Sequence, residues 1–253
     1  DARAVEGALL DVVDHPPSIP PGGTRSNHPA PDAPRRPRDY SGAMILTKRE
    51  HACLVIEHDG ASLVIDPGSF TAAFDAPGLV GVVVTHEHAD HITAEHLDQL
   101  LAAAPDAQLF APAGVAASLP GFAWQIVTAG DARSAGPFSL AFSGGRHAVI
   151  HASLPVVDNL GVMVNETLYY PGDSFTQPEG PVDVLAVPAS APWLKIGEVM
   201  DYLEAVRPRR AFPTHERVNS DAGNAMANGR IKHVVESHGG EFVPLAAGDT
   251  LEL

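Results

Sequence analysis

Cysteine is nearly absent from this chain, with Cys53 alone among 253 residues. An intrachain disulfide is therefore excluded, and because Cys53 lies in an apolar run it is predicted to be a buried thiol rather than a nucleophile. No run of about 18 or more apolar residues occurs, which excludes a membrane-spanning helix. The first residues also lack the basic-then-apolar pattern of an export signal. Together these absences predict a cytoplasmic protein that does not bind a membrane.

Basic residues are also scarce. The chain has 16 Lys and Arg against 31 Asp and Glu, a formal net charge of −15. This balance disfavours nucleic-acid binding, because basic side chains must neutralise phosphates. Hydrophobic residues make up 45% of the chain, enough for a sizeable core in one large α/β domain. A small-molecule substrate is therefore expected rather than a nucleic acid, and the composition leaves a homo-oligomer open.

The chain divides into two parts by composition. Residues 1–43 form a Pro-rich extension in which Gly, Ser, Asn and Arg alternate with proline, and such a segment cannot build a packed core. Residues 44–253 are predicted to form a single domain. Candidate functional residues are therefore sought in the second part only.

Short apolar runs and amphipathic segments give the element order of the domain. The predicted strands are 44–47, 53–57, 62–65, 81–85, 108–111, 124–128, 137–143, 160–165, 167–170, 182–187 and 210–213, with short strands at the C-terminus. The predicted helices are 93–104, with Thr93 as N-cap, 196–206 and 219–238. Strands come first and then alternate with helices, and this order occurs twice. The pattern predicts an α/β (α+β) fold with two sheets packed together and helices outside.

The densest cluster of candidate ligands follows the apolar run at 81–84. It reads Thr85-His86-Glu87-His88-Ala89-Asp90-His91. Alternate side chains of a loop can converge on one point, and imidazoles and carboxylates are preferred ligands of zinc and similar divalent ions. His86, His88, Asp90 and His91 are therefore candidate metal ligands.

Three further candidates each follow an apolar strand. His147 comes after 137–143, Asp173 after 167–170 and His215 after 210–213. Side chains at successive strand ends can meet at one edge of the folded sheets. A common explanation for all seven residues is a shared metal site.

The order of these motifs resembles the metallo-β-lactamase fold superfamily. The matching text is HxHxDH at 86–91, followed by Gly145-Arg146-His147, Gly172-Asp173-Ser174 and Pro213-Thr214-His215. The resemblance covers residues 44–253. Within the superfamily the chain looks closest to the ascorbate-6-phosphate lactonase-like branch, through His51-Ala52-Cys53 and Val64-Ile65-Asp66-Pro67.

The resemblance implies an αββα four-layer sandwich with a two-metal centre at one edge. It places His86, His88 and His147 at the first metal, Asp90, His91 and His215 at the second, and Asp173 between them. Two divalent ions in such a site share a hydroxide that attacks the scissile bond. Asp90 would orient that hydroxide or pass a proton to the leaving group. Zn2+ is the expected ion, with Mn2+ or Fe2+ as alternatives.

Four weaker candidates each have more than one interpretation. His151 lies four residues after His147, and is either a rival ligand, a group facing the substrate or a surface residue. Asp66 either orients a ligand histidine or caps a turn. His51 lies near the site or is a structural histidine, and Lys195 either contacts an anionic group of the substrate or is an ordinary exposed lysine.

The combined interpretation is a metal-dependent hydrolase that cleaves an ester, lactone or phosphoester bond in a small molecule. The alternatives are a β-lactamase or thioester hydrolase of the same fold, and a non-catalytic metal-binding protein.

Overall fold

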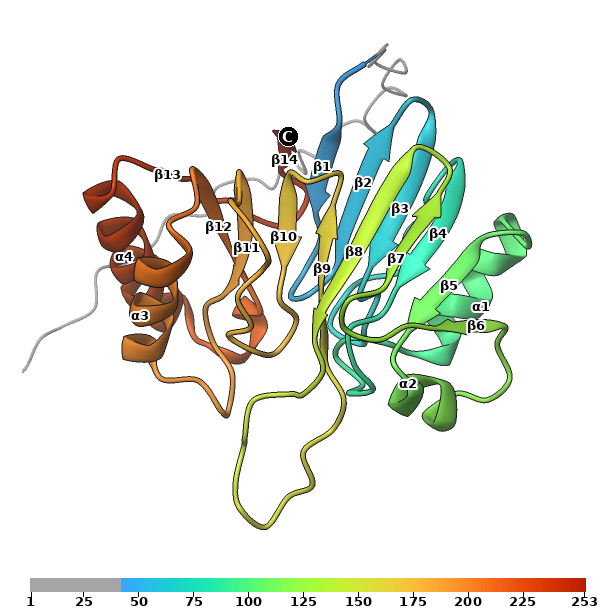
Figure 1. Ribbon diagram of the computed structural model, residues 1–253, viewed down its shortest axis with the longest axis horizontal. Helices are drawn as coiled ribbons and strands as arrows, with labels where there is room; N and C mark the ends of the chain where they lie inside the picture. Colours follow the sequence, from blue (N-terminus) through green and yellow to red (C-terminus); the bar gives the residue numbers. More distant parts are fainter. Residues whose placement is uncertain (1–41) are drawn as a thin grey trace, which may run out of the picture. The chain divides into compact units, whose positions relative to one another are not determined.

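The computed structural model describes residues 42–253. The predicted Pro-rich extension falls almost wholly on residues 1–41, outside the described part. The described chain contains two seven-stranded sheets and four α-helices (Figure 1).

The first sheet has the strand order β14-β1-β2-β3-β4-β5-β6. Its strands are β1 (Ile45–Lys48), β2 (Leu54–His58), β3 (Ala61–Ile65), β4 (Leu79–Val83), β5 (Gln108–Ala111), β6 (Trp124–Ile126) and β14 (Thr250–Glu252). The first three strands are antiparallel, whereas β3 to β6 run parallel to one another.

The second sheet has the order β13-β12-β11-β10-β9-β8-β7. Its strands are β7 (Ala132–Ala135), β8 (Phe138–Gly144), β9 (Leu160–Val164), β10 (Leu168–Tyr170), β11 (Val184–Pro188), β12 (Arg210–Thr214) and β13 (Glu241–Phe242). Strands β10 to β13 are parallel, and β7 to β10 are antiparallel.

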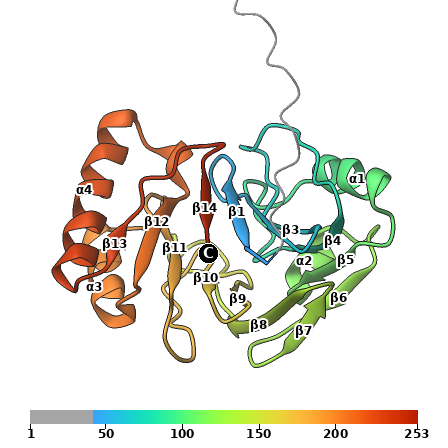
Figure 2. The same cartoon turned by 90° about the horizontal axis from the view of Figure 1, so that it is seen from above.

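The helices lie on the two outer sides, as the view from above shows (Figure 2). Helices α1 (Ala94–Ala103) and α2 (Ala113–Ser118) cover the first sheet, and α3 (Ile196–Val206) and α4 (Asp221–Ser237) cover the second. A 3-10 turn, η1 (Glu216–Val218), connects β12 to α4. None of the described helices has the length and apolarity needed to cross a membrane.

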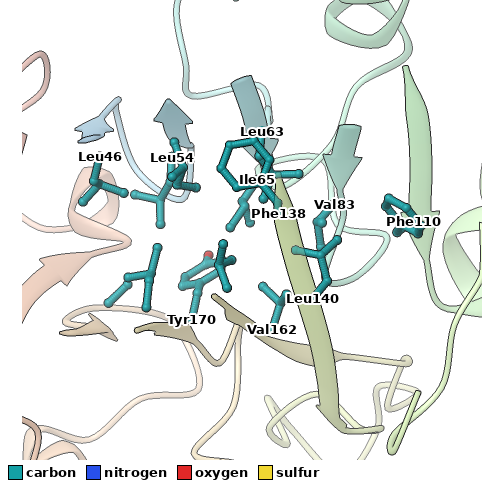
Figure 3. Packing of buried hydrophobic residues seen from close by; sticks show 14 of the residues in the cluster. Leu46, Leu54, Leu63, Ile65, Val83, Phe110, Phe138, Leu140, Val162 and Tyr170 are labelled. Carbon is teal, nitrogen blue, oxygen red and sulfur yellow. The ribbon is translucent and has the colours of Figure 1, made fainter. Parts of the chain in front are cut away.

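The main core lies between the two sheets. Leu54, Ile65 and Val83 from the first sheet face Leu140 and Tyr170 from the second (Figure 3). Strand β8 shows the expected alternation, with alternate residues from its start buried in this core. Two smaller cores fill the space between each sheet and its helices. The predicted αββα sandwich is therefore confirmed.

Most predicted elements occur within one or two residues of their predicted bounds. Thr93 is the N-cap of α1, and its hydroxyl accepts a hydrogen bond from the His96 N–H at 3.2 Å. Helix α4 starts at Asp221, with Ser220 as its N-cap, two residues later than predicted.

Besides the η1 turn, two elements were not predicted. Helix α2 is short, begins after Pro112 without a side-chain cap, and buries only Val115. Strand β7 is the Ala-Arg-Ser-Ala edge strand of its sheet. Neither has an apolar pattern long enough to indicate its type.

Candidate metal centre

Strand direction brings the candidate ligands to one edge of the sandwich. In the first sheet, β1, β3 and β4 run in the same direction, so His51, Asp66 and the 86–91 motif follow strand ends at that edge. In the second sheet, β8, β10, β11 and β12 share a direction, because two antiparallel pairings separate β8 from β10. Residues 145–159, which connect β8 to β9, extend beyond this edge (Figure 1).

The first group of ligand atoms comes from His86, His88 and His147, which lie within 4.8 Å of one another. Nε2 of His86 faces Nδ1 of His88 at 3.1 Å. The His147 ring stands against both rings, with centroids 4.8 and 4.7 Å away. The structure therefore brings together the three residues predicted for the first metal.

The second group contains the predicted Asp90, His91 and His215, together with His51. Nε2 of His215 lies 3.2 Å from Nε2 of His91 and 3.3 Å from Oδ2 of Asp90. Nε2 of His51 lies 3.1 Å from the same Asp90 oxygen.

Asp173 lies between the two groups. Its Oδ2 is 3.4 Å from Nε2 of His147 and 3.2 Å from Nε2 of His215, and its Oδ1 is 3.3 Å from Nε2 of His91. One carboxylate therefore contacts imidazoles of both groups, the position that a bridging ligand requires.

The partners of the Nδ1 atoms indicate which ring nitrogens are free to bind a metal. His91 donates from Nδ1 to Oδ2 of Asp66 at 2.7 Å. His147 and His215 donate to backbone carbonyls, those of Ala148 and Ser190. In the neutral form that can bind a metal, each of these rings carries its proton on Nδ1, which leaves the Nε2 lone pair directed into the cluster.

His86 follows the same rule through Thr85. The Thr85 hydroxyl donates to Oδ2 of Asp66 at 2.7 Å and therefore accepts from Nδ1 of His86 at 3.0 Å. Asp66, which is fully buried, also accepts the Thr85 N–H at 2.8 Å. It thus orients His91 directly and His86 through Thr85, in agreement with the interpretation that it orients a ligand histidine.

Electrostatics in the site favour a bound cation. Burial lowers the pKa of His86 well below its usual value, so this ring is neutral. Burial alone would raise the pKa of Asp173, but His91 and His215 outweigh it and hold that pKa well below its usual range. Burial alone would lower the pKa of His215, but Asp173 raises that pKa to about 9. Without a metal, protons on the imidazoles must balance the carboxylates, and a divalent cation supplies the same charge.

Unpartnered atoms also fit a metal. Nε2 of His147 and Oδ1 of Asp173 are buried and have no hydrogen-bond partner among the described residues. Ring nitrogens of neighbouring imidazoles also lie close together, at 3.1 Å between His86 and His88 and 3.2 Å between His91 and His215. Buried polar atoms normally have partners, so the donor set fits divalent ions that prefer nitrogen and oxygen ligands.

Three residues of the site have an unusual backbone conformation. His51, Asp66 and His215 have φ values of 60°, 48° and 64°, in the left-handed region that non-glycine residues rarely adopt. Such conformations persist where surrounding contacts hold them, and they cluster at functional sites.

Two predicted candidates lie outside the cluster. His151 is exposed, and its Nδ1 bonds to the hydroxyl of Ser153 at 2.8 Å. Lys195 is 83% exposed and pairs with Glu198 at 3.6 Å. Of the two histidines in this loop, the structure places His147 rather than His151 with the other ligands.

Several site residues were not predicted from the sequence. Nε1 of Trp193 donates to Oδ2 of Asp173 at 2.9 Å, and the Asn159 side chain accepts the Asp173 N–H at 2.9 Å. Ser190 makes two hydrogen bonds to His215. Its hydroxyl donates to the His215 carbonyl, and its own carbonyl accepts from Nδ1 of the His215 ring. Ordinary polar residues next to β-strands carry no pattern that distinguishes them, so only contact partners reveal their role.

A cavity of about 690 Å³ adjoins Ser190. Its walls come from the loop after β11 and from α4, and include Ala191, Leu194, Ile196, Met226 and Arg230. Met226 is 70% exposed there, and Arg230 has no ion-pair partner among the described residues.

The chain matches the family model described as the beta-lactamase superfamily domain over residues 45–215. It is 40% identical over 194 residues to Protein Rv0786c of Mycobacterium tuberculosis, a match that covers 74% of this chain and 91% of that protein. It is 31% identical over 193 residues to UPF0173 protein PF0020 of Pyrococcus furiosus, covering 68% and 83% of the two chains.

Among solved structures, the chain is similar to Igni18, described as a novel metallo hydrolase from the archaeon Ignicoccus hospitalis. The TM-score is 0.64 with 20% sequence identity, and the match covers 83% of this chain and 98% of the other. This likeness shows a shared fold.

Proposed function

Because the chain belongs to the beta-lactamase superfamily, we propose that it is a metal-dependent hydrolase that cleaves an ester, lactone or phosphoester bond in a small molecule. The observation that carries the proposal is the convergence of seven imidazole and carboxylate side chains. Six of them form two groups of three, and the seventh, Asp173, lies between these groups. Igni18, which shares the fold, is itself described as a metallo hydrolase.

We assign the candidate ligands to two metal sites. His86, His88 and His147 would hold one ion and Asp90, His91 and His215 would hold the other, and Asp173 lies between the two groups. Zn2+ is the first choice, and Mn2+ or Fe2+ fits the same ligands. Bound divalent ions supply a Lewis acid and lower the pKa of a water molecule to about 7.

Asp90 is the carboxylate that a substrate can reach. Its side chain is 24% exposed, against 5% for Asp173. Burial alone would raise its pKa, but His215 and His51, whose Nε2 atoms lie 3.3 and 3.1 Å from Oδ2, hold that pKa far below its usual range, so the group is ionised. We assign Asp90 the role of orienting the attacking water through a hydrogen bond and guiding its proton toward the leaving oxygen.

The cavity beside Ser190 is proposed to hold the part of the substrate that does not react. Its volume is in the usual range for small-molecule sites. Apolar side chains such as Leu194 and Met226 favour an apolar body, and Arg230 favours an acceptor or anionic group on it. Met226→Ser and Arg230→Gln should therefore raise KM with little change in kcat, whereas Lys232→Gln, on the same helix, serves as the control.

The first experiment is the metal content per chain of protein purified without a metal-affinity tag. The proposal expects about two ions per chain and a lower content in Asp173→Ala. Asp131→Ala is the matched control, because this carboxylate pairs with Arg133 at an exposed turn and belongs to neither group of candidate ligands. This variant should keep both ions. Wild-type protein that binds no metal after reconstitution would contradict the proposal.

The second experiment is a screen of the metal-loaded protein on chromogenic esters, lactones, phosphodiesters, a thioester and a cephalosporin. Turnover of an ester, lactone or phosphoester that is lost on chelation supports the proposal. Preference for the cephalosporin or thioester would replace the proposed bond type, and inactivity on all would favour a metal-binding protein.

A further inference from the structure

His51 lies in the turn between β1 and β2, with its side chain fully buried at the metal centre. Its Nε2 is one of four ligand atoms in the second group, with those of Asp90, His91 and His215. Position alone therefore allows two roles: a fourth protein ligand of that metal, or a hydrogen-bond donor to Asp90.

The partner of Nδ1 separates these roles. The backbone N–H of Arg217 donates to Nδ1 of His51 at 3.3 Å. A neutral imidazole whose Nδ1 accepts a hydrogen bond carries its proton on Nε2. This is the opposite tautomer to those of His91, His147 and His215, whose Nδ1 atoms face acceptors. The Nε2 atom of His51 therefore has no lone pair for a metal, and has a proton directed at Oδ2 of Asp90, 3.1 Å away.

The surroundings fix His51 in this orientation. Oε1 of Glu216 accepts the His51 N–H at 3.0 Å, and the His51 carbonyl accepts the His215 N–H at 3.0 Å. The His51 ring also packs on the His215 ring, with centroids 3.8 Å apart. These contacts hold His51 at its positive φ of 60°.

Glu216 is in turn fixed by a buried lysine. Nζ of Lys48 lies 2.9 Å from Oε1 of Glu216, and the Lys48 side chain is only 1% exposed. The same ammonium donates to the Arg49 carbonyl at 3.0 Å. A buried lysine needs such partners, so the pair gives the η1 turn a fixed position against β1. Both Glu216 and Arg217, which contact His51, lie on that turn.

We propose that His51 is a positioning residue and not a metal ligand: it donates Nε2–H to Asp90, in a tautomer set by Arg217 and an orientation set by the Lys48–Glu216 pair. The proposal rests on the proposed metal centre. The hydrogen bond keeps the Asp90 carboxylate in one orientation beside His215. It also leaves the second group with three protein ligands besides Asp173.

The decisive measurement is the tautomer of His51 in the full-length protein. Long-range proton–nitrogen NMR of 15N-labelled protein distinguishes Nε2–H from Nδ1–H rings, and the close ring of Phe70, 4.8 Å away, provides the assignment. We expect Nε2–H in both the metal-free and the zinc-loaded protein. An Nδ1–H tautomer with a metal-shifted Nε2 in the zinc-loaded protein would overturn the proposal. This measurement requires no variant to fold.

Variants give a second readout through zinc binding measured by chelator competition. His51→Gln keeps an N–H donor and His51→Leu does not, so zinc affinity should fall about 10–100-fold in His51→Leu and less in His51→Gln. Both should keep the wild-type number of ions. Loss of one ion from both variants would identify a ligand and overturn the inference, whereas wild-type protein without metal would instead contradict the proposed hydrolase.

Discussion

Replacing Asp66 with Asn is the sharpest test of how the site is organised. The substitution keeps size and shape, and Asn tolerates the positive φ of 48° at this position. Asp66 accepts three hydrogen bonds: Oδ1 from the Thr85 N–H, and Oδ2 from the Thr85 hydroxyl and from Nδ1 of His91. An amide has one acceptor oxygen, so one side of the group must become a donor.

The backbone N–H of Thr85 cannot turn, so the amide oxygen is expected to remain opposite it. The NH2 group then faces the Thr85 hydroxyl, which can rotate, and Nδ1 of His91, which cannot. His91 must move its proton to Nε2, the atom directed at the metal. The loss of hydrogen bonds to a charged group should lower the free energy of unfolding by about 2–3 kcal/mol, and zinc affinity should fall about 10–100-fold.

Zinc affinity from chelator competition and urea unfolding of the metal-free protein measure the two effects separately. Ser62→Ala is the matched control, because its buried hydroxyl, on the β3 strand that ends just before Asp66, bonds to the Pro77 carbonyl at 2.6 Å, away from the histidines. The control should lose about 1 kcal/mol of stability and keep its zinc affinity. Wild-type zinc affinity in Asp66→Asn would refute the argument that Asp66 sets the tautomer of His91.

Three further predictions concern packing, metal binding and pH. Gly68→Ala should destabilise the protein by about 1–3 kcal/mol in urea unfolding, because the added Cβ would overlap the Asp90 backbone; Gly121→Ala, which meets open space, should have little effect. A chelator should lower Tm by about 5–10 °C relative to zinc-saturated protein at 100 times Kd, and an unchanged Tm would argue against a bound ion. Burial raises the pKa of Cys53, so iodoacetamide should react slowly with native protein at pH 8 and fast in urea. Because the folded state keeps this proton, its stability should fall as the pH rises above the unfolded thiol pKa of about 8.5, and equal native and unfolded reaction rates would contradict the burial argument.

Strand pattern and ligand motifs are local properties of the sequence, and they predicted most of this protein. Short apolar runs gave nearly all strands, because most strands are buried at successive positions and therefore carry apolar side chains along most of their length. The motif at 86–91 and the positions of His147, Asp173 and His215 after strands gave the candidate ligands. The resemblance to a known superfamily then supplied the αββα arrangement, which the structure confirms.

The local sequence pattern did not predict the short or polar elements. Helix α2 and strand β7 have few apolar residues, so their conformation depends on neighbours that the local pattern does not contain. The same holds for Trp193 and Asn159, which contact Asp173 across 20 and 14 residues of chain.

The sequence by itself determined which chemical groups reach the edge of the two sheets. Only the tertiary structure decided which nitrogen of each ring faces inward. His51 and His91 are chemically identical side chains, yet one Nδ1 meets the Arg217 N–H, 166 residues away, and the other meets the Asp66 carboxylate. The proton of an imidazole follows its hydrogen-bond partner, and a partner brought close by folding leaves no trace in the local pattern of residues.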